Sequence, residues 1–128
     1  MSNWLILFQT DYRTLGQIDS VMMAGSWNLL NTSGYDVLLE CQKQGVEVHN
    51  AGIFASGLLV GGSTLDYAPA PEHMIQKRDQ WAALAKQYGV TLPVLAMKFA
   101  ILPHVITKIA VGVKHPREVE INVRGIQV

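Results

Sequence analysis

The regular alternation of short apolar runs with amphipathic stretches is the feature that most limits what this chain can fold into. Apolar runs bounded by turn residues are typical of buried strands, and they occupy 19–25, 46–54 and 108–112. Helical spacing of apolar residues marks 4–15, 33–44, 71–88, 92–102 and the segment that Pro116 opens. Strands that alternate with helices form parallel sheets with right-handed crossovers, so we predict an α/β fold.

Glycine and proline mark the boundaries of these predicted elements. Gly45 and Gly89 stand just past two helices, where a left-handed residue commonly ends a helix. Pro71 is expected as the first helical residue of the longest helix, because its missing N–H is not needed there. Before that helix, residues 56–63 read as a glycine-rich loop that continues to Pro71.

Composition narrows the class of protein. The chain has 128 residues, which fits one domain over 1–128, and its ten basic residues balance ten acidic ones. A disordered chain has more net charge, and a nucleic-acid-binding protein is usually basic. No signal peptide or spanning segment is visible, and the single cysteine, Cys41, favours a reducing cytoplasm. We therefore expect no nucleic-acid partner and no membrane partner.

Three short strands make an incomplete sheet. Parallel sheets are normally buried on both faces, and unpaired apolar edges invite association. Only 16% of the residues are charged, against roughly 25% in an ordinary soluble domain. These features predict that the chain buries further surface, against a copy of itself or against a partner.

Candidate chemistry is weak when each residue is read alone. The four histidines and Cys41 lack the spacing of metal ligands, so no metal site is predicted. His49 reads as a satisfied core histidine, and Cys41 as a buried helix residue. The glycines at 57–62 match no phosphate-binding pattern. The start of the last helix, at Pro116, could hold an anion through its free N–H groups, as any such helix could.

Four motifs in sequence carry a resemblance to a known family. They are Met1-Ser2-Asn3-Trp4, Ala24-Gly25-Ser26-Trp27-Asn28-Leu29-Leu30, Gly52-Ile53-Phe54-Ala55-Ser56-Gly57-Leu58-Leu59, and the segment from Ile106 through Gly112 and Pro116 to Asn122. In this order and spacing the chain resembles the aldo-keto reductases, within the branch of aldose and sugar-lactone-forming dehydrogenases. The resemblance implies a partial (β/α)8 barrel, roughly its second half, with strands six to eight and their flanking helices.

The resemblance also implies a site for a nicotinamide dinucleotide, NAD or NADP. The implied residues are Ser2 and Asn3 at the carboxamide, Ser56, Gly57 and Leu59 along the pyrophosphate, and Gly112, Lys114 and Asn122 around the adenosine. Glu118 departs from the family pattern, because it stands where an arginine often binds the 2′-phosphate of NADP. Lys114 and His115 could bind that phosphate instead, so the choice between NAD and NADP stays open.

The resemblance assigns no catalytic residue to this chain. The family's proton-donating tyrosine, and the lysine, aspartate and histidine that assist it, belong to the first half of the barrel. No tyrosine here matches that motif. We therefore expect a fragment of an NAD(P)-dependent oxidoreductase acting on sugar or aldehyde carbonyls, inactive alone. Two other hypotheses stay open: a non-catalytic half-barrel that homodimerises or complements a partner chain, and a truncated, unstable product.

Overall fold

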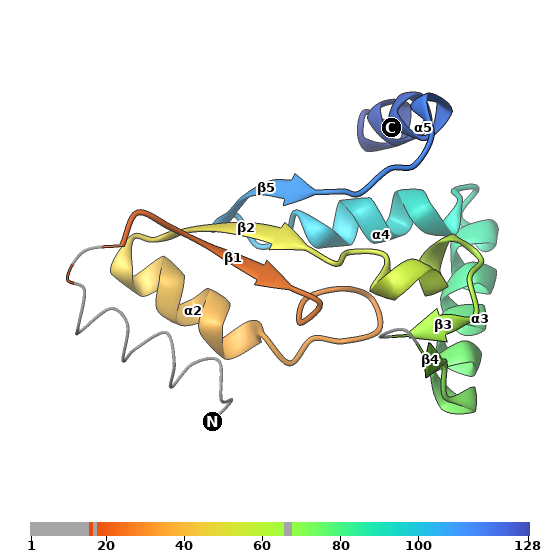
Figure 1. Ribbon diagram of the computed structural model, residues 1–128, viewed down its shortest axis with the longest axis horizontal. Coiled ribbons are helices and arrows are strands. Elements are labelled where there is room, and N and C mark those ends of the chain that lie inside the picture. Colours follow the sequence, from red (N-terminus) through yellow and green to blue (C-terminus); the bar gives the residue numbers. More distant parts are fainter. Residues whose placement is uncertain (1–15, 17, 66–67) are drawn as a thin grey trace.

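Three parallel strands form the central sheet of this computed structural model, which describes residues 16, 18–65 and 68–128. The strands are β1 (Ser20–Ala24), β2 (Glu47–Ala51) and β5 (Ile106–Ala110), in the order β1-β2-β5. All three strands run in the same direction, so their carboxyl ends lie at the same end of the sheet (Figure 1). The predicted α/β fold with a parallel sheet is confirmed. The predicted helix over 4–15 lies outside the described residues.

Strand β5, predicted over 108–112, begins two residues earlier than predicted. Ile106 is buried and pairs with Val48 of β2, so the ladder starts there and ends at Ala110 instead of Gly112. The local apolar pattern did not show which residues the neighbouring strand would bury.

Within the described residues, four α-helices accompany the sheet, and their bounds follow the predicted ones closely. They are α2 (Tyr35–Gln44), α3 (Glu72–Gln87), α4 (Leu92–Ala100) and α5 (Pro116–Ile126). Gly45 ends α2 in the left-handed conformation, as predicted, with φ 71°. Pro71 has extended backbone (ψ 145°), so it precedes α3 as its cap and is not its first helical residue. No helix within the described ranges is long and apolar enough to span a membrane.

The segment predicted as a long glycine-rich loop is partly regular. Residues Ala55–Val60 form a 3₁₀ helix, η1, which the left-handed Gly61 ends. A short antiparallel pair, β3 (Thr64–Leu65) and β4 (Ala68–Pro69), follows and leads into α3. The loop prediction fails because Leu58 and Leu59 are fully buried, and their burial fixes the backbone around the glycines.

Helices cover one face of the sheet. Met23 and Val48 pack with Leu38 of α2 in one core cluster, and Phe99 of α4 packs against that cluster. The other face carries register rows of exposed or half-buried side chains, namely Met22, His49 and Lys108, and then Ala24, Ala51 and Ala110. His49 therefore lies on this open face, with Nε2 3.3 Å from Glu47 Oε2, and the prediction of a core histidine is wrong.

One buried amide ties the sheet to two neighbouring elements. Asn50 of β2 is fully buried, and its Nδ2 donates hydrogen bonds of 3.0 Å to the carbonyls of Trp27 and Ala100. The Trp27 ring stacks on Phe99, with 5.1 Å between ring centroids, and its Nε1 donates to the Leu102 carbonyl. These contacts fix the segment after β1 against the end of α4.

Cys41 is expected to resist thiol reagents in the folded protein. It is fully buried in α2, as predicted, and burial, with a smaller contribution from the Glu40 carboxylate, raises the pKa of its thiol to about 11. The thiolate is the nucleophile, so alkylation by iodoacetamide at neutral pH should be at least about tenfold slower than in urea. Mass spectrometry of timed samples measures this, and equal rates in both conditions would contradict the burial.

Candidate functional site

A groove of about 440 Å³ lies beyond the carboxyl ends of β2 and β5. Its walls come from two segments far apart in sequence, 52–60 after β2 and 110–118 after β5. In Figure 1, η1 lies beyond the tip of β2, and the chain leaving β5 rises toward α5. Ligand sites in parallel α/β proteins gather at this end of the strands. The groove is therefore the candidate site.

The first wall is a turn of unusual backbone conformation. Ala55, Ser56 and Gly57 all have positive φ, at 51°, 57° and 96°. Non-glycine residues rarely adopt this region, and such strain concentrates at binding sites where the surroundings hold it. The Ala55 N–H donates to the Gly52 carbonyl (3.2 Å), and the Gly57 N–H donates to that of Phe54 (3.1 Å). Ser56 and Gly57 line the groove from this turn.

The second wall is the link from β5 into α5. Gly112 and Lys114 line the groove there, together with Glu118 from the first turn of α5. The Glu118 carboxylate accepts hydrogen bonds from the backbone N–H groups of Lys114 (2.6 Å) and His115 (3.2 Å). These bonds, the one from Lys114 most, lower the pKa of Glu118 below its ordinary value. A negative charge of the chain itself therefore faces this end of the groove.

The amides at the start of α5 differ from the sequence-based expectation. We expected free N–H groups that any anion could reach. Those of Lys114 and His115 already bind Glu118, and that of Arg117 donates to the His115 ring (3.2 Å). A bound anion would compete with Glu118 for the first two.

The structure brings together four of the eight residues that the resemblance implied: Ser56, Gly57, Gly112 and Lys114. Leu59 is fully buried in the core beneath, and its N–H donates to the Phe54 carbonyl (3.1 Å). Asn122 lies further along α5, half-buried and away from the groove lining. Ser2 and Asn3 lie outside the described residues.

Sequence reasoning missed the apolar part of the lining. Phe54, Val60 and Val111 border the groove, and Val60 is 53% exposed. The signal available was position alone, because residues directly after a buried strand reach the edge where ligands bind. Within the described ranges, no three His, Cys, Asp or Glu side chains come close enough to hold a metal ion. The groove therefore combines apolar side chains with the glycine-containing turn of η1, Lys114 and Glu118.

A smaller cavity of about 110 Å³ lies beside the loops after β1 and β2. Gly25, Gly52 and Ser56 line it, with Met74 of α3. The two strand ends approach so closely here that a Cβ on Gly52 would lie 2.6 Å from the Gly25 nitrogen. Gly52 thus lines both the groove and this smaller cavity, and the absence of a side chain there allows the two strand ends to approach.

Comparison with known proteins places this chain in a family. The profile of the aldo/keto reductase family matches residues 5–128. The chain belongs to the aldo/keto reductase family, which confirms the resemblance drawn from the four motifs.

Three characterised relatives share this similarity over most of the chain. Pyridoxal 4-dehydrogenase from Microbacterium luteolum is 30% identical in an alignment that covers 96% of this chain and 37% of the relative. D-threo-aldose 1-dehydrogenase from a Pseudomonas species is 25% identical over 82% of this chain and 34% of the relative. NADH-specific methylglyoxal reductase from Escherichia coli K12 is 26% identical over 92% and 40%. The chain thus spans less than half the length of each.

A solved structure shares the fold. An aldo-keto reductase from Bacillus halodurans in its holo form superposes with a TM-score of 0.68 at 23% identity, over 94% of this chain and 41% of that one. The parallel sheet and its helices therefore correspond to part of a family member.

Proposed function

We propose that this chain forms the dinucleotide-binding part of an aldo-keto reductase barrel, roughly its second half. The observation that carries the proposal is the groove itself, which joins Ser56 and Gly57 to Gly112 and Lys114 across about 55 residues of sequence. In this proposal the pyrophosphate of NAD or NADP lies along the left-handed turn of η1, and the adenosine lies toward α5. Leu59 supports the turn from the core, and Asn122, Ser2 and Asn3 keep their proposed roles at the two ends of the cofactor.

The bound cofactor would supply the hydride for reduction of a carbonyl, or accept it in oxidation of an alcohol. The chain's own contribution is to orient it: the η1 turn limits the path of the pyrophosphate, and Phe54 and Val60 exclude water from its apolar side. The names of the relatives, which include an aldose dehydrogenase and a methylglyoxal reductase, support a sugar or small aldehyde as the substrate class.

We propose NAD over NADP as the cofactor. Glu118 is ionised, lines the groove, and occupies the amides of Lys114 and His115. A 2′-phosphate brought to this end meets that charge and competes for those amides. Lys114 offers a cation, but it does not remove the carboxylate. The name of the Escherichia coli relative, an NADH-specific enzyme, is consistent with this choice.

We further propose that neither tyrosine in the described part of the chain is the proton donor. Tyr35 stacks on Trp27, with 5.8 Å between ring centroids, and Tyr88 is 75% exposed at the end of α3. Neither lines the groove. A dinucleotide bound there has no phenol beside it from the described part of the chain.

Calorimetric titration of the purified chain with NAD, NADP and ADP-ribose tests this function. We expect saturable 1:1 binding of NAD and ADP-ribose, and no oxidation of NADH or NADPH with simple aldehydes nor reduction of either cofactor with aldoses. Absence of any dinucleotide binding would overturn the proposed site. Turnover well above background would overturn the proposal that the chain is inactive alone.

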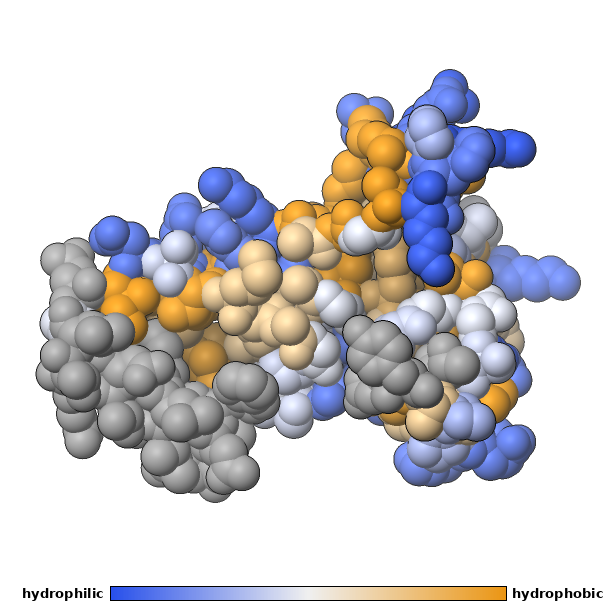
Figure 2. Space-filling view, in the orientation of Figure 1, coloured by the Kyte–Doolittle hydropathy of each residue, from blue (hydrophilic) through white to orange (hydrophobic). Residues whose placement is uncertain are grey.

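A non-catalytic half-barrel that associates with a copy or a partner is the second candidate. Two observations favour it: the open face of the sheet exposes Met22 (64%), and α5 exposes Val119, Ile121 and Val123. Figure 2 shows an apolar strip along one side of α5, with polar side chains on its other side. Among the described strands, β1 and β5 each pair on one edge only. Light scattering distinguishes the candidates, because a stable monomer at micromolar concentration would contradict self-association.

A further inference from the structure

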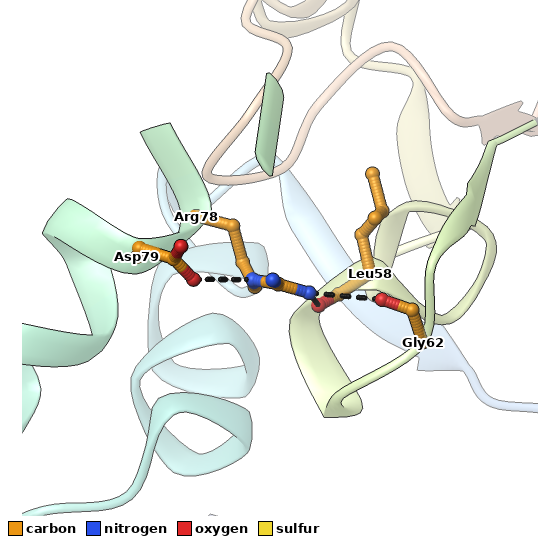
Figure 3. A network of polar contacts seen from close by, with 4 residues as sticks. All are labelled: Leu58, Gly62, Arg78 and Asp79. Atoms are coloured by element: carbon orange, nitrogen blue, oxygen red, sulfur yellow. Dashed lines mark hydrogen bonds and ion pairs between the residues drawn. The ribbon is translucent and has the colours of Figure 1, made fainter. Parts of the chain in front are cut away.

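Arg78 of helix α3 donates hydrogen bonds to the backbone at the end of the η1 turn (Figure 3). Its Nη1 donates a hydrogen bond of 2.8 Å to the Gly62 carbonyl and a longer one of 3.5 Å to that of Leu58. Its Nε donates to Asp79 Oδ1 at 2.9 Å, which aims the other end of the guanidinium at η1. The Arg78 side chain is only 18% exposed. A positive charge at the carboxyl end of a helical turn also interacts favourably with the carbonyls there.

Gly62 connects Arg78 to Gly57, which lines the groove. The Gly62 N–H donates to the Gly57 carbonyl at 2.8 Å, and a Cβ on Gly62 would lie at the same 2.8 Å from that oxygen. Arg78 therefore holds Gly62, the residue whose N–H binds the Gly57 carbonyl. Because the peptide between Gly57 and Leu58 is planar, holding the Gly57 carbonyl also sets the direction of the Leu58 N–H within the η1 turn.

This turn needs such support. Ala55 and Ser56 hold left-handed backbone without being glycine, and strained residues of this kind persist only where neighbours over-determine them. Arg78 supplies that constraint from a helix that does not itself line the larger groove.

We propose that Arg78 is a positioning residue for the dinucleotide: it acts through Gly62 to hold the η1 turn in the shape that receives the pyrophosphate. This inference rests on the proposed function of the groove. Its neighbour Lys77 makes a comparable bond elsewhere, from Nζ to the Leu30 carbonyl after β1 (3.4 Å), so it provides a matched control.

Hydrogen exchange of the ligand-free chain gives the first test. Arg78→Lys keeps the positive charge but loses the planar guanidinium that donates to Asp79 and Gly62 together. Arg78→Gln loses both the charge and the guanidinium. We expect both to speed exchange of the amides at 55–62 by about tenfold, the effect of losing one charged hydrogen bond. Lys77→Gln should leave these amides unchanged. The role of Arg78 would be overturned if exchange at 55–62 were unaltered in Arg78→Lys. It would also be overturned if Lys77→Gln sped exchange there as much as the Arg78 variants do.

Ligand binding gives the second test, with a readout that general loss of stability does not move. Both Arg78 variants should bind ADP-ribose about tenfold more weakly, and adenosine, which lacks the pyrophosphate, within twofold of the unmodified chain. If Arg78→Lys binds ADP-ribose normally, charge alone suffices and positioning is wrong. If the unmodified chain binds no dinucleotide, the proposed function fails and the pyrophosphate role of Arg78 fails with it. The exchange result still decides whether Arg78 holds the turn.

Discussion

Replacing Gly52 with alanine should destabilise the fold by about 2–5 kcal/mol, the sum expected for a left-handed alanine and a backbone clash. Gly52 has φ 67°, which an alanine adopts only with strain. The added Cβ would lie 2.6 Å from the nitrogen and 3.0 Å from the Cα of Gly25. That nitrogen donates to the Ala51 carbonyl at 3.0 Å, so relief by movement would break the contact between the ends of β1 and β2. Urea unfolding followed by tryptophan fluorescence measures the loss.

Gly45→Ala is the matched control for this variant. Gly45 has nearly the same backbone conformation (φ 71°), but a Cβ there meets nothing within 4 Å. It should therefore cost only about 1–2 kcal/mol, the conformational part alone. The difference between the two variants isolates the clash. Gly52→Ala should also abolish dinucleotide binding at temperatures where it stays folded, because Gly52 borders the groove. Equal losses of stability in both variants would contradict the close approach of the strand ends.

The parallel sheet could be predicted from local sequence pattern, whereas the start of β5 and the 3₁₀ helix after β2 could not. The run ending at Gly25 indicates β1 to within a residue, because a buried strand bounded by turn residues is a local signal. The start of β5 depends on Ile106 meeting Val48, a contact set by a strand 58 residues away. The 3₁₀ helix after β2 likewise depends on tertiary burial of Leu58 and Leu59, which the surrounding glycines obscure.

The candidate site divides in the same way. Ser56, Gly57, Gly112 and Lys114 were predicted from motifs, and the fold brings them to one groove. The cap formed by His115 and Glu118 has the spacing of a capping box, but histidine is not a usual residue for its first position, so the pattern gave no warning. Arg78 lies mid-helix with no local signal at all. Its role depends on where α3 crosses the η1 turn.

Removing the charge of Glu118 should reduce or reverse the proposed preference for NAD over NADP. Glutamine keeps an oxygen that can accept the Lys114 and His115 amides, and it serves at this position of a capping box, so Glu118→Gln changes charge with little change in the helix start. We expect NADP affinity to rise by about tenfold relative to NAD, the effect of converting a repelled phosphate into one bound by charged hydrogen bonds. Titration calorimetry with both cofactors measures the ratio.

Glu120→Gln gives the matched control for that ratio. Glu120 lies on the same exposed helix and carries the same charge, but it pairs with Arg124 and does not line the groove. The positive charge of Arg124 offsets that of Glu120, and exposed charges of this kind interact weakly with other groups. Glu120→Gln should therefore leave the ratio of NAD to NADP affinity within twofold of the unmodified chain. An equal shift in both variants would mean that overall charge sets the preference. No shift in either would mean that the 2′-phosphate does not approach α5, and the adenosine end of the cofactor would then need another place in the groove.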